Sequence, residues 1–300
     1  MRDDPAIDVP SGRPASMPTP PPGSPLLGRL SLNQRTTANW TVGEAIAGAH
    51  AAGLPAIGLW REPVAEWGLD RTVAAVRDAG LRVSSLCRGG FFTDEDAEQF
   101  RLALAENREA IEEAAALGTD CLVLVPGGLP QGRRDLPAAR QCVVDAIGEL
   151  VPSAREAGVR LAIEPMHPIF AADRGVISTL AQALDIAELF TVDEVGVVVD
   201  TYHVWWDPDV VRDVLRAGPR IASYQVCDWI TPLPADTLLG RGMMGDGHID
   251  FGPTTEAVSA AGYSGDVEVE IFNAEIWAAP GADVVATLAR RYAELIAPHL

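Results

Sequence analysis

The stretch VGVVVDTYHVWW at residues 195–206 carries the pattern that decides the fold. Four valines and a glycine form an apolar run that ends in Asp200, and His203 follows three residues later. Such a run is typical of a strand that is buried on both faces of a parallel sheet. A carboxylate and a histidine directly after it indicate that this strand ends at a reactive site.

Seven further apolar runs occur along the chain, and most are separated by longer segments with helical periodicity. Glycine closes several helical segments, for example at Gly53, Gly80 and Gly118, shortly before the next run begins. Eight strand–helix units in about 270 residues predict an α/β fold of the (β/α)8 or TIM barrel type. A doubly wound open sheet is the weaker competitor, because no GxGxxG follows the first run. The predicted strands are residues 30–36, 56–61, 82–88, 121–127, 160–167, 196–203, 221–228 and 266–272.

Composition and charge exclude several classes of protein. The chain has 300 residues, of which 48% are hydrophobic, so a sizeable core is available. Its net charge of −19 opposes binding to nucleic acid and to anionic membranes, and we expect neither as a partner. The sequence contains no lysine, which excludes Schiff-base aldolases, pyridoxal-phosphate enzymes and P-loop phosphate sites.

Cysteine usage and hydropathy predict a cytoplasmic protein. The four cysteines are far apart and form no CxxC pair, which is typical of reduced thiols. No apolar run approaches the roughly 18 residues that a bilayer span needs, and the N-terminus has no hydrophobic signal core.

The first 28 residues differ from the rest of the chain because eight of the 23 prolines fall there. Proline at this density opposes helices and sheets, so we predict a disordered or extended tail over residues 1–28. Packing of the tail across a neighbouring subunit is the alternative. Residues 29–300 are then a single catalytic barrel.

Polar residues end the later predicted strands, and such positions converge at one mouth of a barrel. Three carboxylates there would repel each other unless a cation compensates them. Pairing of each acid with an arginine is the alternative to a metal. Oxygen-dominated coordination favours Mn²⁺ or Mg²⁺ over Zn²⁺, and Co²⁺ is also compatible. The predicted ligands are Glu164, Asp200 and Glu270, with the amide oxygen of Gln225 as the neutral fourth.

Other polar residues near these strand ends have two interpretations each. His167 and His203 are candidates for a base or a substrate donor, and each also suits a structural role. Arg241, in the glycine-rich loop 238–251, suits either a substrate oxygen or a structural ion pair.

The order Glu, Asp-x-x-His, polar ligand and Glu along strands five to eight resembles the xylose isomerase-like barrel superfamily. Within it the chain is similar to the sugar phosphate isomerase/epimerase group, which includes tagatose and allulose epimerases and inosose-processing enzymes. The likeness extends from about residue 30 to the C-terminus, and its most specific pieces are IEPMHP, VDTYHVWW, GRGMMGDGHIDF and VEVEIF.

This resemblance implies a Mn²⁺-type site in which both glutamate ligands, Glu164 and Glu270, exchange protons with the carbon beside a ketone. It also implies that His203 and Arg241 face the substrate. One departure is Gln225, because the seventh-strand ligand in this group is commonly histidine.

The EPMH segment also resembles the catalytic subunit of C-glycoside deglycosidases. That likeness implies His167 as the base and a small second subunit as partner; otherwise we expect a homo-oligomer.

We therefore predict an enzyme that isomerises or epimerises a keto-sugar through a metal-stabilised enediolate. The alternative is a 3-keto-sugar lyase of the deglycosidase type, which cleaves a C–C or C–O bond by elimination. An endonuclease-like phosphodiesterase and a non-enzymatic sugar-binding barrel are the remaining interpretations.

Overall fold

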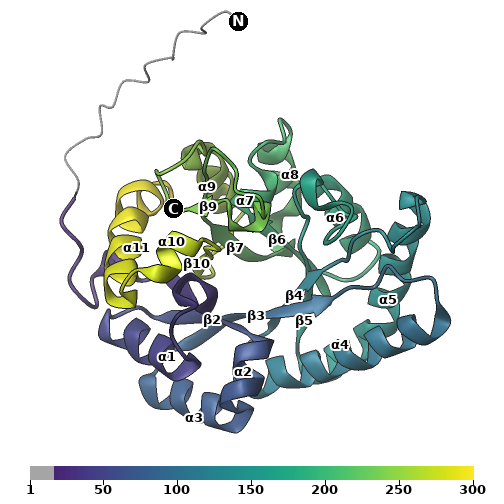
Figure 1. The fold of residues 1–300 in the computed structure, drawn as a ribbon, viewed down its shortest axis with the longest axis horizontal. Helices are drawn as coiled ribbons and strands as arrows, with labels where there is room; N and C mark the ends of the chain where they lie inside the picture. Colours follow the sequence, from purple (N-terminus) through teal and green to yellow (C-terminus); the bar gives the residue numbers. More distant parts are fainter. Residues whose placement is uncertain (1–16) are drawn as a thin grey trace, which may run out of the picture.

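The computed structural model describes residues 17–300. Residues 1–16 of the tail predicted for residues 1–28 therefore lie outside the described residues. Eight parallel strands form a closed barrel, which confirms the predicted (β/α)8 fold (Figure 1). Pairing of β1 with β10 closes the barrel, and the order around it is β1-β10-β7-β6-β5-β4-β3-β2. The strands are β1 (Leu30–Asn33), β2 (Ala56–Trp60), β3 (Arg82–Gly90), β4 (Cys121–Val125), β5 (Arg160–Ile163), β6 (Val195–Asp200), β7 (Ile221–Val226) and β10 (Val267–Val269).

Most of the observed strands end before the predicted ones, and β5 shows why. It ends at Ile163, four residues before its predicted end at His167. Pro165 and Pro168 follow, and proline cannot donate a hydrogen bond to a neighbouring strand. The polar residues of this strand end therefore lie in the loop that begins at the barrel mouth.

Helices surround the barrel, and their ends follow local sequence signals (Figure 1). Asp96 caps the start of α4 by accepting hydrogen bonds from two backbone N–H groups, and Gly118 ends it in the left-handed region. Within residues 17–300, none of the helices combines the length and apolarity that crossing a bilayer requires. The helices are α1 (Val42–Ala51), α2 (Arg61–Trp67), α3 (Leu69–Ala79), α4 (Ala97–Leu117), α5 (Leu136–Ala157), α6 (Leu180–Ala187), α7 (Thr201–Val204), α8 (Val210–Ala217), α9 (Phe251–Ala260), α10 (Ala274–Ala278) and α11 (Gly281–Leu295).

A small antiparallel pair, β8 (Asp228–Trp229) and β9 (Arg241–Gly242), follows β7 at the barrel mouth. The Asp228 carboxylate organises it by accepting hydrogen bonds from four backbone N–H groups, three of them in the glycine-rich loop 245–249. These hydrogen bonds therefore fix the backbone of the loop. Strand β9 places Arg241 near the barrel axis.

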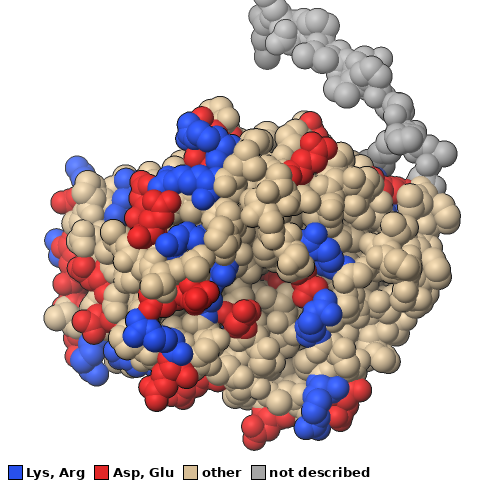
Figure 2. Space-filling model, turned by 180° about the vertical axis from the view of Figure 1, so that it is seen from behind, with Lys and Arg blue, Asp and Glu red and all other residues tan. Residues whose placement is uncertain are grey.

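Acidic and arginine side chains are intermixed in small groups on the face shown in Figure 2. That face has no continuous basic surface of the kind that neutralises a row of phosphates.

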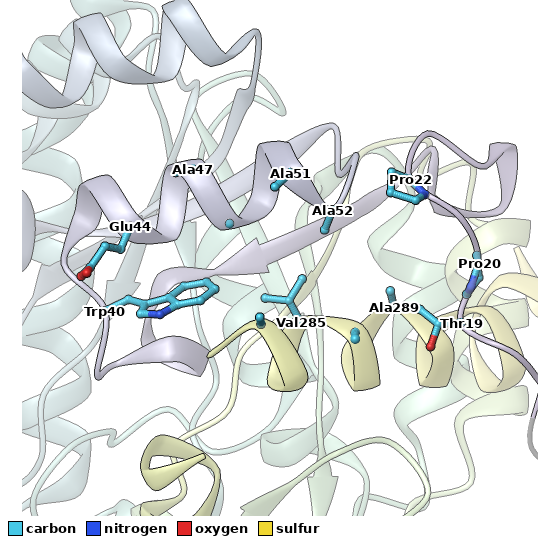
Figure 3. A pocket seen from close by; sticks show the side chains of 13 residues that line it. Thr19, Pro20, Pro22, Trp40, Glu44, Ala47, Ala51, Ala52, Val285 and Ala289 are labelled. Carbon is cyan, nitrogen blue, oxygen red and sulfur yellow. The ribbon is translucent and has the colours of Figure 1, made fainter. Parts of the chain in front are cut away.

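The described part of the predicted tail packs against the barrel's outer helices. Thr19, Pro20 and Pro22 lie across the ends of α1 and α11 and border an apolar cavity of about 580 Å³ (Figure 3). Residues 25–27 form a 3-10 helix, η1 (Pro25–Leu27), although the sequence predicts a tail through residue 28. Leu27 of this helix is buried, with 1% of its surface exposed. The neighbouring Leu26 is 49% exposed.

This difference predicts unequal costs for two neighbouring substitutions. Leu27→Ala should lower the free energy of unfolding by about 2–4 kcal/mol, because it removes buried methyl groups and leaves a cavity. Leu26→Ala is the matched control and should cost less than about 1 kcal/mol. Urea denaturation of both variants measures this, and equal costs would contradict the packing of η1 on the barrel.

Candidate active site

The carboxyl ends of β5, β6, β7 and β10 bring the four predicted ligands together at the barrel axis. Asp200 on β6 pairs in register with Gln225 on β7, and paired residues in a parallel sheet point to the same face. Glu164 follows β5 and Glu270 follows β10. Asp200 and Gln225 are fully buried, and Glu164 and Glu270 are 4% and 3% exposed.

Arg241 is the cation that the structure places among these carboxylates. Its Nη1 donates to Asp200 Oδ2 and to Glu270 Oε2, each at 2.9 Å. Its guanidinium lies over the rings of Tyr202 and Phe272, with distances of 4.8 and 5.1 Å to the ring centroids. Arg241 is only 2% exposed and packs on two aromatic rings, so its guanidinium has little freedom to move.

One guanidinium does not compensate the carboxylates fully. Burial, together with repulsion from Asp200 and Glu270, raises the pKa of Glu164 well above its ordinary value. Burial also raises the pKa of Glu270, to about 7, although Arg241 opposes the rise. The site is therefore short of positive charge.

Two oxygen ligands at the site lack hydrogen-bond partners among residues 17–300. Gln225 Nε2 donates to Glu268 at 3.2 Å, which leaves the buried Oε1 without a partner. The carboxylate of Glu164, which lines the pocket, also accepts no hydrogen bond from any described residue. An unpaired buried amide oxygen and an unbonded carboxylate beside surplus negative charge fit a hard divalent cation. The residues present therefore fit a metal site.

His203 also belongs to this cluster. Three potential metal-ligand atoms lie within 4.8 Å of one another, one each from Glu164, Asp200 and His203. The backbone N–H of His167 donates to Nδ1 of His203 at 3.1 Å, and Arg241 Nη2 lies 3.1 Å from Nε2. Burial, with Arg241 nearby, lowers the pKa of His203 well below its ordinary value, so the ring is neutral.

The His167 side chain does not line the pocket at this cluster. Its ring packs on Trp229 and Trp206, with centroids 4.7 and 5.7 Å away. Its Nδ1 accepts a hydrogen bond from the backbone N–H of Ile169 and so caps η3 (Pro168–Phe170). Burial lowers the pKa of His167 to about 4. Its contact with His203 runs through its own backbone.

Glu268 is a functional residue that the sequence reasoning did not single out. It lies fully buried below Glu270 and accepts hydrogen bonds from Asn33, at 2.6 Å, and from Gln225. Ser84 and Ser85 also donate to it, at 2.6 and 2.8 Å. The two-residue offset from Glu270 is the sequence signal that places both side chains on one face.

Asn33 and Trp60, which end β1 and β2, complete the support of Glu270. Asn33 Nδ2 donates to Glu270 Oε1 at 2.9 Å, and Trp60 Nε1 lies 3.2 Å from the same atom. Trp60 also donates to Asn33 Oδ1 at 3.1 Å. Glu270 is therefore held at both carboxylate oxygens, by neutral donors on one side and by Arg241 on the other.

A small pocket of about 170 Å³ opens above the cluster. Glu164, His203, Arg241 and Glu270 line its floor, whereas His167 is not among its lining residues. The predicted site residues thus meet at one place, with the His167 ring outside it.

Comparisons with known proteins agree with this architecture. Residues 46–294 match the family described as xylose isomerase-like TIM barrel. Inosose isomerase from Halalkalibacterium halodurans is 25% identical over 212 residues, which cover 70% of this chain and 73% of that protein.

Solved structures show the same fold. Protein SMc04130 from Sinorhizobium meliloti 1021 is 46% identical, with a TM-score of 0.87 over 90% of this chain and 98% of that chain. The IOLI protein with a bound zinc atom is 22% identical, with a TM-score of 0.80 over 91% of this chain and 99% of that chain.

The charge deficit predicts an unusual response to removal of Arg241. Without a metal, Arg241→Met should lower the free energy of unfolding by about 3–5 kcal/mol, because buried carboxylates lose their only ionic partner. Added Mn²⁺ should restore more stability to this variant than to the parent protein.

Arg291→Met is the control, because Arg291 forms an ion pair with Asp246 at 3.0 Å, and Asp246 is not among the predicted ligands. Thermal melting in chelator and in Mn²⁺ measures both effects. Equal metal responses in the two variants would contradict the assignment.

Proposed function

We propose, from the premise that this chain belongs to the xylose isomerase-like TIM barrel family, that it is a divalent-metal-dependent sugar isomerase or epimerase. The reaction moves a proton on the carbon next to the carbonyl of a keto-sugar. The observation that carries this proposal is the set of buried carboxylates that Arg241 alone does not compensate, at the floor of a pocket. The similarity to a protein named inosose isomerase supports it.

Glu164, Asp200, Gln225 and Glu270 would hold the metal. A bound divalent ion would polarise the carbonyl as a Lewis acid and so acidify the neighbouring C–H bond. The oxygen-dominated ligands favour Mn²⁺, with Mg²⁺ and Co²⁺ as alternatives.

Glu164 and Glu270 are the proposed proton carriers. Burial raises the pKa of Glu270 to about 7 without a metal, and a bound divalent ion would lower it, so that Glu270 is ionised and able to accept a proton. The carboxylate of Glu164 makes no hydrogen bond among the described residues, so it is available to the substrate. Two carboxylates allow the proton to leave and return at different positions.

Arg241 and His203 are the proposed donors to substrate oxygens. Both line the pocket floor, and both are buried among groups that keep their orientation. Donors that are already oriented stabilise the negative charge that develops on an enediolate oxygen.

The keto-sugar lyase alternative assigns the base to His167. The stacking of its ring on Trp229 and its use of Nδ1 as a helix cap favour a structural role instead. We therefore assign proton transfer to the glutamates.

Metal content tests the first part of this proposal. The purified protein should hold about one divalent ion per chain, and Glu270→Gln should remove most of the metal and the activity, because a carboxylate ligand is lost. Glu98→Gln, on the exposed side of α4, is the control and should keep both. Elemental analysis without stoichiometric metal, with activity that resists chelators, would contradict the proposal.

Proton exchange tests the second part. In deuterated water, Glu164→Gln and Glu270→Gln should each slow single-turnover exchange beside the carbonyl by about 10²–10⁴-fold, the range for loss of a general base. His167→Ala should slow it by no more than about tenfold. A larger loss for His167→Ala at unchanged metal content would return the assignment to the lyase mechanism.

A further inference from the structure

Three arginines line the rim of the pocket above the carboxylates. Arg35 lies in the 3-10 helix η2 (Gln34–Thr37) that follows β1, Arg88 lies near the end of β3, and Arg174 lies in the loop after β5. All three line the same pocket as Glu164 and Glu270. Their side chains are 28%, 33% and 36% exposed, so each is partly withdrawn from water.

These arginines have few partners for the charge they carry. Arg35 and Arg88 share one carboxylate, Glu62, at 3.4 and 3.7 Å, and Arg174 Nε lies 3.6 Å from Asp173. Each guanidinium has five N–H donors, yet only the Arg35 contact is within hydrogen-bond distance. The Nε atoms of Arg35 and Arg174 are buried without a hydrogen-bond partner among the described residues.

Two arginines elsewhere in the chain are bonded more fully. Arg61 donates to both oxygens of Glu113, and Arg216 donates to both oxygens of Glu188. These two arginines therefore use more of their donors than the rim arginines do, although the Nε of Arg291 is also buried without a hydrogen-bond partner among the described residues.

Aromatic rings hold two of the rim guanidinium groups in place. Arg35 lies 4.9 Å from the centroid of the Trp60 ring, and Arg88 lies 4.3 Å from that of Phe91. Stacking on a ring orients a guanidinium and leaves its edge free for an acceptor. A planar or tetrahedral oxyanion is the acceptor that such an edge binds most strongly.

We propose that the substrate carries an oxyanion, either a carboxylate or a phosphate, at the end remote from its carbonyl, and that Arg35, Arg88 and Arg174 bind it. This proposal rests on the proposed function, because that function places the substrate carbonyl at the floor of the pocket. The floor has surplus negative charge and repels an anion, whereas the rim carries three positive charges against the carboxylates of Glu62 and Asp173. This distribution of charge favours one orientation of an anionic keto-sugar, with its carbonyl at the floor and its oxyanion at the rim.

A matched set of ligands tests the proposal: D-fructose, D-fructose 6-phosphate and D-fructuronate, which are a neutral ketose, its 6-phosphate and its 6-carboxylate. Titration calorimetry on the Mn²⁺-loaded protein should show at least tenfold tighter binding of one anionic ligand than of fructose. Which one binds more tightly identifies the oxyanion. Titrations with inorganic phosphate and acetate extend the test to anions without a sugar.

Arg88→Gln and Arg174→Gln should each weaken binding of the preferred anion by about tenfold and leave fructose binding unchanged. Arg77→Gln is the charge-matched control, because Arg77 is 73% exposed on α3 and should change neither affinity.

Two outcomes would overturn the proposal. The first is the absence of an anion preference: fructose binds as tightly as both anionic ligands, or none of the three ligands, phosphate and acetate binds at all. The second is an anion preference that survives in both rim variants. Because these measurements use binding and not turnover, a failure of proton exchange with the anion preference intact would reject only the proposed function.

Discussion

Burial of four carboxylates beside a single guanidinium is the constraint on which the rest of the site depends. Two like charges about 4 Å apart repel by about 4 kcal/mol at an effective dielectric constant of 20. The four carboxylates are compensated in different ways: Arg241 pairs with Asp200 and Glu270, and neutral donors surround Glu268. The carboxylate of Glu164 has neither an ion pair nor a hydrogen bond among the described residues. Glu164 is thus the carboxylate of this cluster that the protein compensates least.

The surroundings of Arg241 follow from the same constraint. Its position depends on β9, and β9 depends on the backbone hydrogen bonds that Asp228 accepts in the neighbouring loop. Asn273 also donates to the carbonyl of Arg241, at 2.8 Å. A carboxylate outside the pocket therefore stabilises the arrangement of charges inside it, because it fixes the loop that carries the guanidinium.

The sequence was sufficient to predict the barrel and the convergence of four ligand positions, because both follow from topology. Once strands are parallel and close into a barrel, residues such as Asp200 and Glu270 must meet at its carboxyl end. The support of Glu268 by Asn33 and Ser85 was not predictable in this way. These contacts join residues 235 and 183 positions apart, and they depend on the stagger of strands across the barrel.

The missed helix at residues 25–27 and the location of Arg174 have a related explanation. Leu27 is buried because the chain passes over α11, and that contact has no local signal in a proline-rich segment. Arg174 lies in a loop, so no strand end predicts its place at the pocket rim. Strand topology therefore located the floor of the site and could not locate Arg174 at its rim.

The absence of lysine connects the floor and the rim. Without a lysine amine the site cannot form a Schiff base, and we propose that carboxylates move the protons. Arginine keeps its charge at every working pH, and it acts at both levels of the pocket. At the floor Arg241 pairs with two carboxylates, which keeps it among the proposed reacting groups. At the rim the Nε of Arg174 has no hydrogen-bond partner among the described residues, and the Asp173 carboxylate lies 3.6 Å away. In the proposed function, arginine would therefore orient catalytic groups at one level of the pocket and bind the substrate at the other.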